Sequence, residues 1–451
     1  MPPLLIEPLA YTSDSTELFS RFLDWKQPVY LDSSAPHSAR GRYDIFSAEP
    51  VHLVTVNEFS SYNSKTYNEE LNPFQEIKKA IEQFTPAVNN DFQLPFIGGA
   101  IGYFGYDLGR QLEQMEHRTA ADLTAATTQV GIYSWAVIVD HWQKQTVLLC
   151  HPSTSEVLIK ELRQILAAPA HQHSVAFFNT TAEFKANMSR AEYDNAFNTI
   201  QGYIQAGDCY QINLAQRFST GYSGDPWAAY LRLRKAAAAP FSAFIKTPNS
   251  TLMSLSPERF IQSRQQRVHT APIKGTIARG RTREEDDALA QQLLSSTKDR
   301  AENLMIVDLL RNDLGKSCLP GTIAVDALFE LQSFETVHHL VSTISGQLRD
   351  GIEPLDLLSS CFPGGSITGA PKVRAMEIIE ELEPHRRSAY CGAIGYISCD
   401  GQMDTNIAIR SLLCNQQQIH CWAGGGIVAD SEVDSEYLEC MTKIEKLLAV
   451  L

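Results

Sequence analysis

Apolar residues recur at helical spacing in several segments of the chain. The segment 189–207 is the clearest, because Tyr193, Phe197, Ile200 and Ile204 lie three or four positions apart. This spacing places their side chains on one face and predicts an amphipathic helix. A polar helix is predicted after residue 151, and later helices over roughly 285–315, 371–382 and 432–449.

Short apolar runs bounded by turn residues predict strands at 51–56, 130–140 and 146–150. The segment 98–110 alternates glycine with aromatic residues, which indicates close backbone approach within a sheet. Helices and strands alternate irregularly, without repeated βαβ units, which favours the α+β class. A stretch of weak signal after residue 165 predicts two parts, 1–165 and 187–449.

The composition of the chain argues against some classes of binding partner. The chain has 451 residues, 44% of them hydrophobic, and a formal net charge of −14, which argues against binding to nucleic acid or to an anionic membrane surface. The nine cysteines form no C-x-x-C pair, which indicates reduced thiols and a cytoplasmic protein. No signal peptide is evident, and no apolar run reaches the ~20 residues of a membrane span.

Two glycine-rich stretches, 361–372 and 423–431, resemble nucleotide-binding loops only in part. The first has Ala370-Pro371 where a P-loop needs Lys-Ser or Lys-Thr, and the second has no room for a βαβ unit after it. Both nucleotide readings are therefore rejected. Two readings stay open: tight structural turns, and loops that lead into helices and bind an anion such as a carboxylate with backbone N–H groups.

Acidic residues cluster on two predicted helices. Asp299 and Glu302 lie three apart on one, while Glu436, Glu439 and Lys443 share a face of the other. If the helices met, Glu302 and Glu439 could hold Mg²⁺, which needs only one or two carboxylates plus other oxygens. A solvated helix face with an ordinary Glu–Lys pair explains the same spacing.

Other polar residues stand in apolar surroundings. Lys274 lies between Pro272-Ile273 and Gly275-Thr276, and His339 and Arg410 each interrupt an apolar run. A buried arginine needs an anionic partner, whereas a lone histidine is usually a hydrogen-bonded core residue. Glu258 follows an apparent strand as either a solvated residue or a general acid.

The ordered motifs resemble the chorismate-utilising enzymes, a family that includes anthranilate, isochorismate, salicylate and aminodeoxychorismate synthases. The motifs occur in this order: SLSPERF, PIKGT, DRAENLMIVDLLRND, HHLVSTI, FPGGSITGAPK, Tyr390-Cys-Gly, IAIRSLL and AGGGIVADS with E-x-x-E-x-x-x-K. The resemblance covers residues ~187–449 strongly and the N-terminal part more weakly. It implies a large two-part α+β fold, with β-sheets packed as a sandwich, helices outside and the active site in a cleft.

Two positions distinguish branches of that family. The anthranilate branch resembles PIAGT, with alanine in place of Lys274, and the water-adding branches carry a basic lysine where DCYQINLAQ places Gln211. The resemblance therefore implies amination of chorismate to 4-amino-4-deoxychorismate, on the route to para-aminobenzoate and folate, through a covalent Lys274 adduct. Alternatives are anthranilate synthesis, a PLP enzyme with a Lys274 Schiff base, and a non-catalytic tryptophan-binding subunit.

The resemblance also implies a role for each motif residue. Lys274 is the expected nucleophile and Glu258 the general acid, with Mg²⁺ held by Glu302 and Glu439 and with Glu436 and Asp299 beside them. The expected substrate-binding residues are Gln211, Gly275, Thr276, His339, Ser366, Tyr390, Arg410, Gly424, Gly425, Gly426 and Lys443.

Two further molecules are implied. Ammonia is expected from a separate glutamine amidotransferase subunit, because the chain lacks a G-x-C-x-G nucleophile turn. Family members also carry an N-terminal tryptophan pocket, and a bound L-tryptophan is expected here. Its matching residues are Ser33, Arg40, Gly41, Arg42, Tyr43, Pro240, Phe241 and Ser242.

Overall fold

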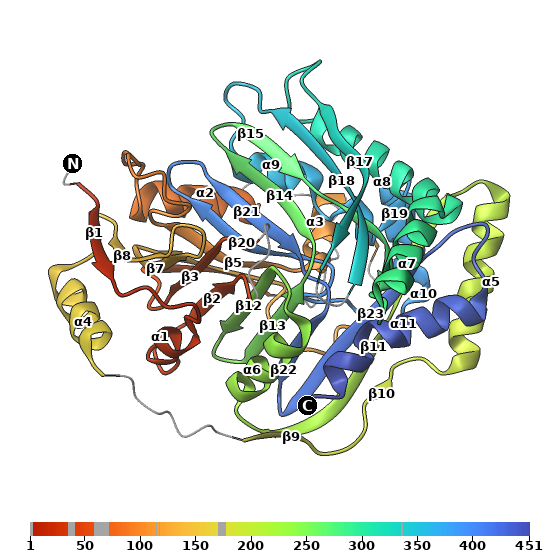
Figure 1. The fold of residues 1–451 in the computed structure, drawn as a ribbon, viewed down its shortest axis with the longest axis horizontal. Helices are drawn as coiled ribbons and strands as arrows, with labels where there is room; N and C mark the ends of the chain where they lie inside the picture. The colour runs from red at the N-terminus through yellow and green to blue at the C-terminus, as the bar shows by residue number, and fades with distance from the viewer. Residues whose placement is uncertain are drawn as a thin grey trace.

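The computed structural model describes residues 3–34, 41–57, 72–113, 115–116, 118–169, 177–334 and 337–451. These residues form two antiparallel β-sheets, of 13 and 10 strands, with helices around them (Figure 1). The α+β class and the sandwich predicted from the resemblance are confirmed. Among the described helices, none has the length and apolarity to cross a membrane.

The larger sheet combines strands from both ends of the chain. Its strands, in spatial order, are β1 (Leu5–Leu9), β8 (Gln145–Cys150), β7 (Trp135–Asp140), β3 (Tyr43–Ser47), β2 (Val29–Asp32), β12 (Phe241–Lys246), β13 (Ser250–Ser256), β22 (Ser411–Asn415), β23 (Gln418–Ile427), β11 (Gln211–Gly224) and β10 (Lys185–Ala186). Two short strands also pair with β11, namely β9 (Phe178–Thr180) and β19 (Gly369–Ala370).

The smaller sheet is interleaved in the same way. Its order is β16 (Ile273–Ala278), β18 (Val337–Gln347), β15 (Arg267–Thr270), β14 (Arg259–Arg264), β21 (Met403–Ile407), β20 (Ala393–Ser398), β5 (Gly99–Phe104), β6 (Thr128–Tyr133) and β4 (His52–Val56). The strand β17 (Ala324–Ser333) also pairs with β18. Segments 1–165 and 187–449 thus contribute strands to both sheets, and the division between them stays a prediction.

Helices cover the outer faces and the ends of the sheets. They are α1 (Thr16–Ser20), α2 (Pro73–Phe84), α3 (Gly109–Glu113), α4 (Glu156–Ala167), α5 (Arg190–Ala206), α6 (Pro226–Ala237), α7 (Arg283–Ser295), α8 (Thr297–Gly315), α9 (Pro354–Cys361), α10 (Lys372–Leu382) and α11 (Val433–Leu448), with 3₁₀ turns η2 (Tyr106–Leu108) and η3 (Gly365–Ile367). Figure 1 shows α5, α10 and α11 at the end of the molecule away from α4. There α10 packs on β11 and α11 on β23, while α7 and α8 pack on β16 and β18.

The core lies between the two sheets, and strand periodicity builds it. In β3, Ile45 belongs to the inter-sheet cluster while its neighbour Phe46 packs in a second cluster on the outer face of the larger sheet. Successive strand side chains point to opposite faces, and here both faces are buried. Because of this, the run 130–140 had no alternating pattern, and the structure divides it at Ser134 into β6 and β7.

Candidate active site

Lys274 lies on an irregular part of β16. The pairing of β16 with β18 shifts register between Ile273 and Thr276, so Lys274 and Gly275 occupy a bulge. Gly275 has a φ of +82°, which favours glycine. The Lys274 side chain is half-buried, and its charge opposes the rise that burial causes in the pKa of Glu302 and adds to the effect of Lys443 and Lys298 in lowering the pKa of Glu439. The predicted nucleophile therefore faces two of the predicted metal ligands.

Thr276 and His339 meet across the same strand pair. The Thr276 Oγ1 and His339 Nδ1 atoms are 2.7 Å apart, and the edge of the His339 ring packs on Phe334 with centroids 5.4 Å apart. His339 is buried and hydrogen-bonded, as expected of a core histidine. Its position one strand away from Lys274 also agrees with the predicted site.

Glu258 is buried beside the 3₁₀ turn η3. Only 6% of the residue is exposed, and Ser366 Oγ donates a hydrogen bond of 2.8 Å to its Oε1. The Glu258 backbone carbonyl accepts a hydrogen bond from the N–H of Ile407. The solvated reading of this strand-end acid is thus wrong, and the loop places the predicted Ser366 on the predicted acid.

The two acidic helices do meet. Lys298 of α8 lies 3.2 Å from Glu436 Oε1 of α11 and 4.0 Å from Glu302 Oε1. Burial raises the pKa of Glu302. Burial also acts to raise the pKa of Glu439, but the nearby ammonium groups, Lys443 first among them, lower it overall. The predicted i,i+4 pair is present, with Lys443 Nζ 2.7 Å from Glu439 Oε1.

The donor chemistry of this cluster fits Mg²⁺. Carboxylate oxygens of Glu302, Glu436 and Glu439 are hard ligands of the kind that Mg²⁺ selects. Within the part of the chain that the structure describes, no group of three or more such side chains is already arranged as a metal cage. Mg²⁺ commonly takes one or two carboxylates and completes its shell with substrate oxygens and water.

The glycine triplet lies inside β23, where Gly424, Gly425 and Gly426 pair with β11. The prediction of a loop leading into a helix was wrong here, because these residues complete the ladder with β11 before the chain turns into α11. Their missing side chains leave space for two polar neighbours. A Cβ on Gly425 would lie 2.9 Å from Glu436 Oε2, and one on Gly426 would lie 2.8 Å from Gln211 Nε2.

Two polar side chains near the triplet have no side-chain partner among the residues that the structure describes. Gln211 is fully buried, and neither its Oε1 nor its Nε2 has a hydrogen-bond partner among the described residues. Arg410 is partly buried with a φ of +51°, and burial lowers its pKa. Within the described ranges no carboxylate forms an ion pair with it. Such groups are costly unless a ligand completes them.

Tyr390 and Lys443 frame the same region. Tyr390 is buried and stacks on Trp422 with ring centroids 6.1 Å apart, and burial raises its pKa well above the usual value. Lys443 Nζ donates a hydrogen bond of 2.9 Å to the Gly424 carbonyl, in addition to its contact with Glu439. The ammonium group is thereby held beside the glycine triplet.

Lys298 is a site residue that the sequence analysis missed. It stands four positions before Glu302, and this Lys-x-x-x-Glu spacing was the available signal. Its contact with Glu436 on another helix could not be read from spacing, because it depends on how α8 and α11 pack.

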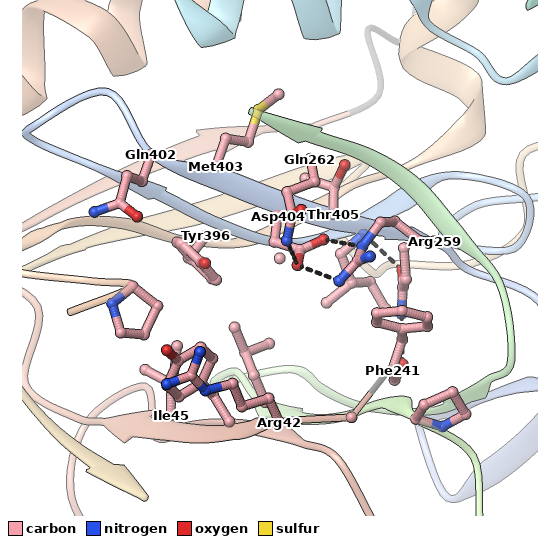
Figure 2. A pocket seen from close by; sticks show the side chains of 18 of the residues that line it. Arg42, Ile45, Phe241, Arg259, Gln262, Tyr396, Gln402, Met403, Asp404 and Thr405 are labelled. Atoms are coloured by element: carbon pink, nitrogen blue, oxygen red, sulfur yellow. Dashed lines mark hydrogen bonds and ion pairs between the residues drawn. The ribbon is translucent and has the colours of Figure 1, made fainter. Parts of the chain in front are cut away.

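A separate cavity of about 280 Å³ lies between the sheets (Figure 2). Six residues of the predicted tryptophan pocket line it, namely Gly41, Arg42, Tyr43, Pro240, Phe241 and Ser242. Ser33 lies next to it, since a Cβ on Gly41 would approach the Ser33 carbonyl oxygen to 2.8 Å. Arg40 lies outside the described residues.

The opposite wall of this cavity was not predicted. Figure 2 shows Tyr396, Met403 and Asp404 facing Arg42 and Ile45, with Arg259 paired to Asp404. The Arg259 Nε lies 2.9 Å from Asp404 Oδ1, and its guanidinium packs on the Phe241 ring. The wall therefore combines an apolar surface with a bidentate ion pair.

Comparison with known proteins agrees with this geometry. A model of the chorismate binding enzyme family matches residues 26–449. Aminodeoxychorismate synthase component 1 of Klebsiella aerogenes is 45% identical over 99% of both chains, and that of Escherichia coli is 44% identical over 98% of this chain and 97% of its own. The crystal structure of anthranilate synthase component I from Streptococcus pneumoniae matches with a TM-score of 0.79 at 29% identity, covering 91% of this chain and 93% of that one. The chain belongs to the family of chorismate binding enzymes.

Proposed function

We propose that this chain aminates chorismate at C4 and forms 4-amino-4-deoxychorismate, the precursor of para-aminobenzoate. The names of the two bacterial relatives support this activity. The observation that carries the proposal is Lys274, a half-buried lysine that acts electrostatically on Glu302 and Glu439. A residue in that position can act as a nucleophile, whereas the alanine of the anthranilate-like motif cannot.

The proposed reaction has two substitution steps. The neutral amine of Lys274 attacks C2 of chorismate and gives up a proton, both ring double bonds shift by one position around the ring, and the C4–O bond breaks. Glu258 protonates the departing hydroxyl, which leaves as water. Ammonia then attacks C4 and loses a proton, both double bonds shift back, and the C2–N bond breaks as Lys274 takes up a proton and leaves as the free amine. A covalent intermediate divides one difficult displacement into two easier ones.

Glu258 is well placed for the role of acid. It is 6% exposed, so bulk water does not compete for its proton, and Ser366 fixes the carboxyl through the bond at Oε1. Gln211, with its amide atoms free among the described residues, stands where the water-adding branches carry a base. An amide cannot deprotonate water, which supports an incoming amine in place of hydroxide.

The proposed binding groups supply positive charge for a dicarboxylate. Arg410 pairs with one carboxylate of chorismate, and Lys443, Tyr390 and the Gly424–Gly426 backbone orient the other carboxylate and the ether. Thr276 and His339 line the ring side. Glu302, Glu436 and Glu439 are the residues that would hold Mg²⁺, which would supply positive charge to stabilise the carboxylates of the substrate.

We propose a glutamine amidotransferase subunit as the source of ammonia. All nine cysteines are free, and burial raises the pKa of each of their thiols. A nucleophilic cysteine needs a lowered pKa, so none of them suits glutamine hydrolysis. Nine free thiols also agree with a location in the cytoplasm.

We also propose that the inter-sheet cavity binds L-tryptophan. Its volume of about 280 Å³ and its lining by Tyr396, Met403 and Ile45 suit an indole ring. The Arg259–Asp404 pair, with Arg42, offers charges of both signs for an α-amino acid. Extraction of the purified chain and chromatography for tryptophan tests this assignment, and an empty extract together with no calorimetric binding contradicts it.

Intact-protein mass spectrometry tests the proposed nucleophile. With chorismate and Mg²⁺ but no ammonia, the unmutated chain should gain the mass of chorismate less one water, and Lys274→Ala should gain nothing. Lys316→Ala removes a different lysine, which is paired with Asp313. It is the matched control and should behave as the unmutated chain. Absence of the adduct from the unmutated chain would leave direct attack of ammonia as the better mechanism.

Product analysis tests the activity itself. With chorismate, Mg²⁺ and ammonium, the expected product is 4-amino-4-deoxychorismate, which a downstream lyase converts to para-aminobenzoate. Formation of anthranilate without the lyase would contradict the proposed function.

A further inference from the structure

Three lysines and four acidic residues meet where α8, α11 and β16 come together. The electrostatic contacts between them join Lys274, Lys298 and Lys443 with Asp299, Glu302, Glu436 and Glu439. Lys274 is the proposed nucleophile, and Lys443 is bound to Glu439 and to the Gly424 carbonyl. Lys298 has no role in the reaction as described, although it contacts two of the proposed metal ligands.

Lys298 is held by Glu436, a carboxylate that is itself fixed. Its Nζ donates to Glu436 Oε1 at 3.2 Å, and Glu302 Oε1 lies 4.0 Å away. The Glu436 side chain is only 3% exposed and accepts a second hydrogen bond of 2.6 Å from Ser431 Oγ. Partial burial acts to lower the pKa of Lys298, but Glu436, Glu302 and Glu439 raise it overall. The ammonium charge is therefore part of the cluster.

The Lys298 side chain can also leave the cluster. Its exposed fraction is 46%, so the flexible stem can carry the charged group into solvent. Glu436, in contrast, is fixed by Ser431 and by the backbone of α11. An ammonium group and a divalent cation repel each other, and both bind carboxylate oxygens. Only one of them can therefore lie next to Glu436 Oε1.

We propose that Lys298 is a built-in competitor of the divalent cation for Glu436 and Glu302, which keeps metal binding weak until chorismate arrives. The inference rests on the proposed function, since it takes these carboxylates as the Mg²⁺ ligands. Chorismate is a dianion and supplies two negative charges together with carboxylate oxygens for the metal. These oxygens favour the divalent cation over a single ammonium group, so Lys298 is released to solvent as the metal and the substrate bind together.

Direct metal binding tests the proposal, with Mn²⁺ as the probe and its free concentration read by electron paramagnetic resonance. Two like charges about 4 Å apart repel each other even in water, and the repulsion is twice as large when one of them belongs to a divalent cation. After screening by salt, Lys298→Met is expected to bind Mn²⁺ at least about tenfold more tightly without chorismate. With saturating chorismate, the difference between the two proteins should shrink to about twofold or less.

Two variants control for charge and for folding. Lys316→Met removes the lysine that directly follows α8, which is 48% exposed and lies 3.0 Å from Asp313, so it should leave Mn²⁺ affinity unchanged. Lys298→Arg keeps the positive charge and should bind Mn²⁺ as weakly as the unmutated chain. Calorimetric unfolding of each variant shows whether it is folded before its affinity is compared.

The outcomes separate this proposal from the proposed function. Unchanged or weaker Mn²⁺ binding in folded Lys298→Met, while the unmutated chain binds Mn²⁺ with chorismate, overturns the role of Lys298 alone. No Mn²⁺ binding by the unmutated chain even with chorismate overturns the metal assignment and this inference with it. If Lys298→Met and Lys316→Met increased the affinity for Mn²⁺ equally, the change in net charge alone would explain the increase, and the proposal would also be refuted.

Discussion

Replacement of Gly275 by alanine perturbs the bulge that carries Lys274. The new methyl group would lie 3.0 Å from Leu293 Cδ1 of α7 and 3.1 Å from both Cβ and Cγ of Asp299 in α8. These separations are shorter than normal carbon–carbon contacts of about 3.5–4.0 Å. The backbone φ of +82° is in addition unfavourable for any residue with a Cβ.

A matched control separates the two contributions to the loss in free energy of unfolding. The left-handed conformation alone costs alanine roughly 1–2 kcal/mol relative to glycine, and overpacking against Leu293 and Asp299 adds roughly 1–3 kcal/mol. Gly207 has the same φ of +82° at the end of α5, but a Cβ there would meet nothing within 4 Å. Gly207→Ala should therefore lose only about 1–2 kcal/mol, and Gly275→Ala about 2–5 kcal/mol.

The rate should respond more sharply than the stability. Relief of the contact with Asp299 moves the start of α8 away from β16, and Glu302 lies one turn further along that helix. Misplacement of reacting groups by about 1 Å costs on the order of a hundredfold in rate. We therefore expect kcat to fall about a hundredfold in Gly275→Ala and to stay unchanged in Gly207→Ala.

Urea unfolding followed by tryptophan fluorescence gives the free energy of unfolding, and product formation with saturating ammonium gives kcat. The comparison of the two alanine variants removes the common backbone effect. If Gly275→Ala matches Gly207→Ala in stability and retains the full rate, then β16 and α8 are not tightly coupled and the argument is refuted.

Three further outcomes are expected. Gly425→Ala should place its Cβ 2.9 Å from Glu436 Oε2 and lower kcat at least tenfold while unfolding energy changes by under ~1 kcal/mol. Burial lowers the pKa of His420 to about 4 in the folded chain. Because the folded pKa lies below the unfolded one, the chain should lose stability as the pH falls below about 6.5, by about 2 kcal/mol between pH 7 and 5. Urea titrations at the two pH values should show a smaller loss for His420→Gln. Arg387→Met removes the guanidinium that lies 2.6 Å from the buried Glu383 and leaves that carboxylate with the Ala215 N–H but without its cation, which should cost about 3–5 kcal/mol in urea unfolding; a loss below ~1 kcal/mol would contradict this.

Helices with a clear apolar period were predictable to within a residue or two, whereas the predicted helical segment 285–315 divides at Ser296 into α7 and α8. The segment 189–207 folds as α5, since Ser189 and Glu192 form a capping box at its start and Gly207 ends it in a left-handed conformation. The structure of the glycine triplet was predicted wrongly because a distant strand, and not the local sequence, determines it. Local composition there matched a turn, and pairing with β11, more than 200 residues earlier in the chain, made it a strand.

Residues of the site were predictable singly, but their partners were not. Thr276 meets His339 because of the register between β16 and β18, and Ser366 meets Glu258 because η3 packs beside the end of β13. Neither register nor packing can be read from local spacing. The ordered motifs identified these residues through their resemblance to a family, and the structure supplied the contacts.

The inter-sheet cavity shows most directly why such contacts escape sequence reasoning. Its predicted wall consists of two segments, 41–43 and 240–242, which lie at the starts of β3 and β12, two strands that flank β2 in one sheet. The opposite wall belongs to the other sheet, and within the described part of the chain no hydrogen-bond ladder connects the two sheets. Tyr396 and Asp404 became lining residues only when the sheets packed face to face. Packing between sheets depends on the summed shape of both inner faces, so the charge that Arg259 and Asp404 present to this cavity is a property of the sandwich and of no single motif.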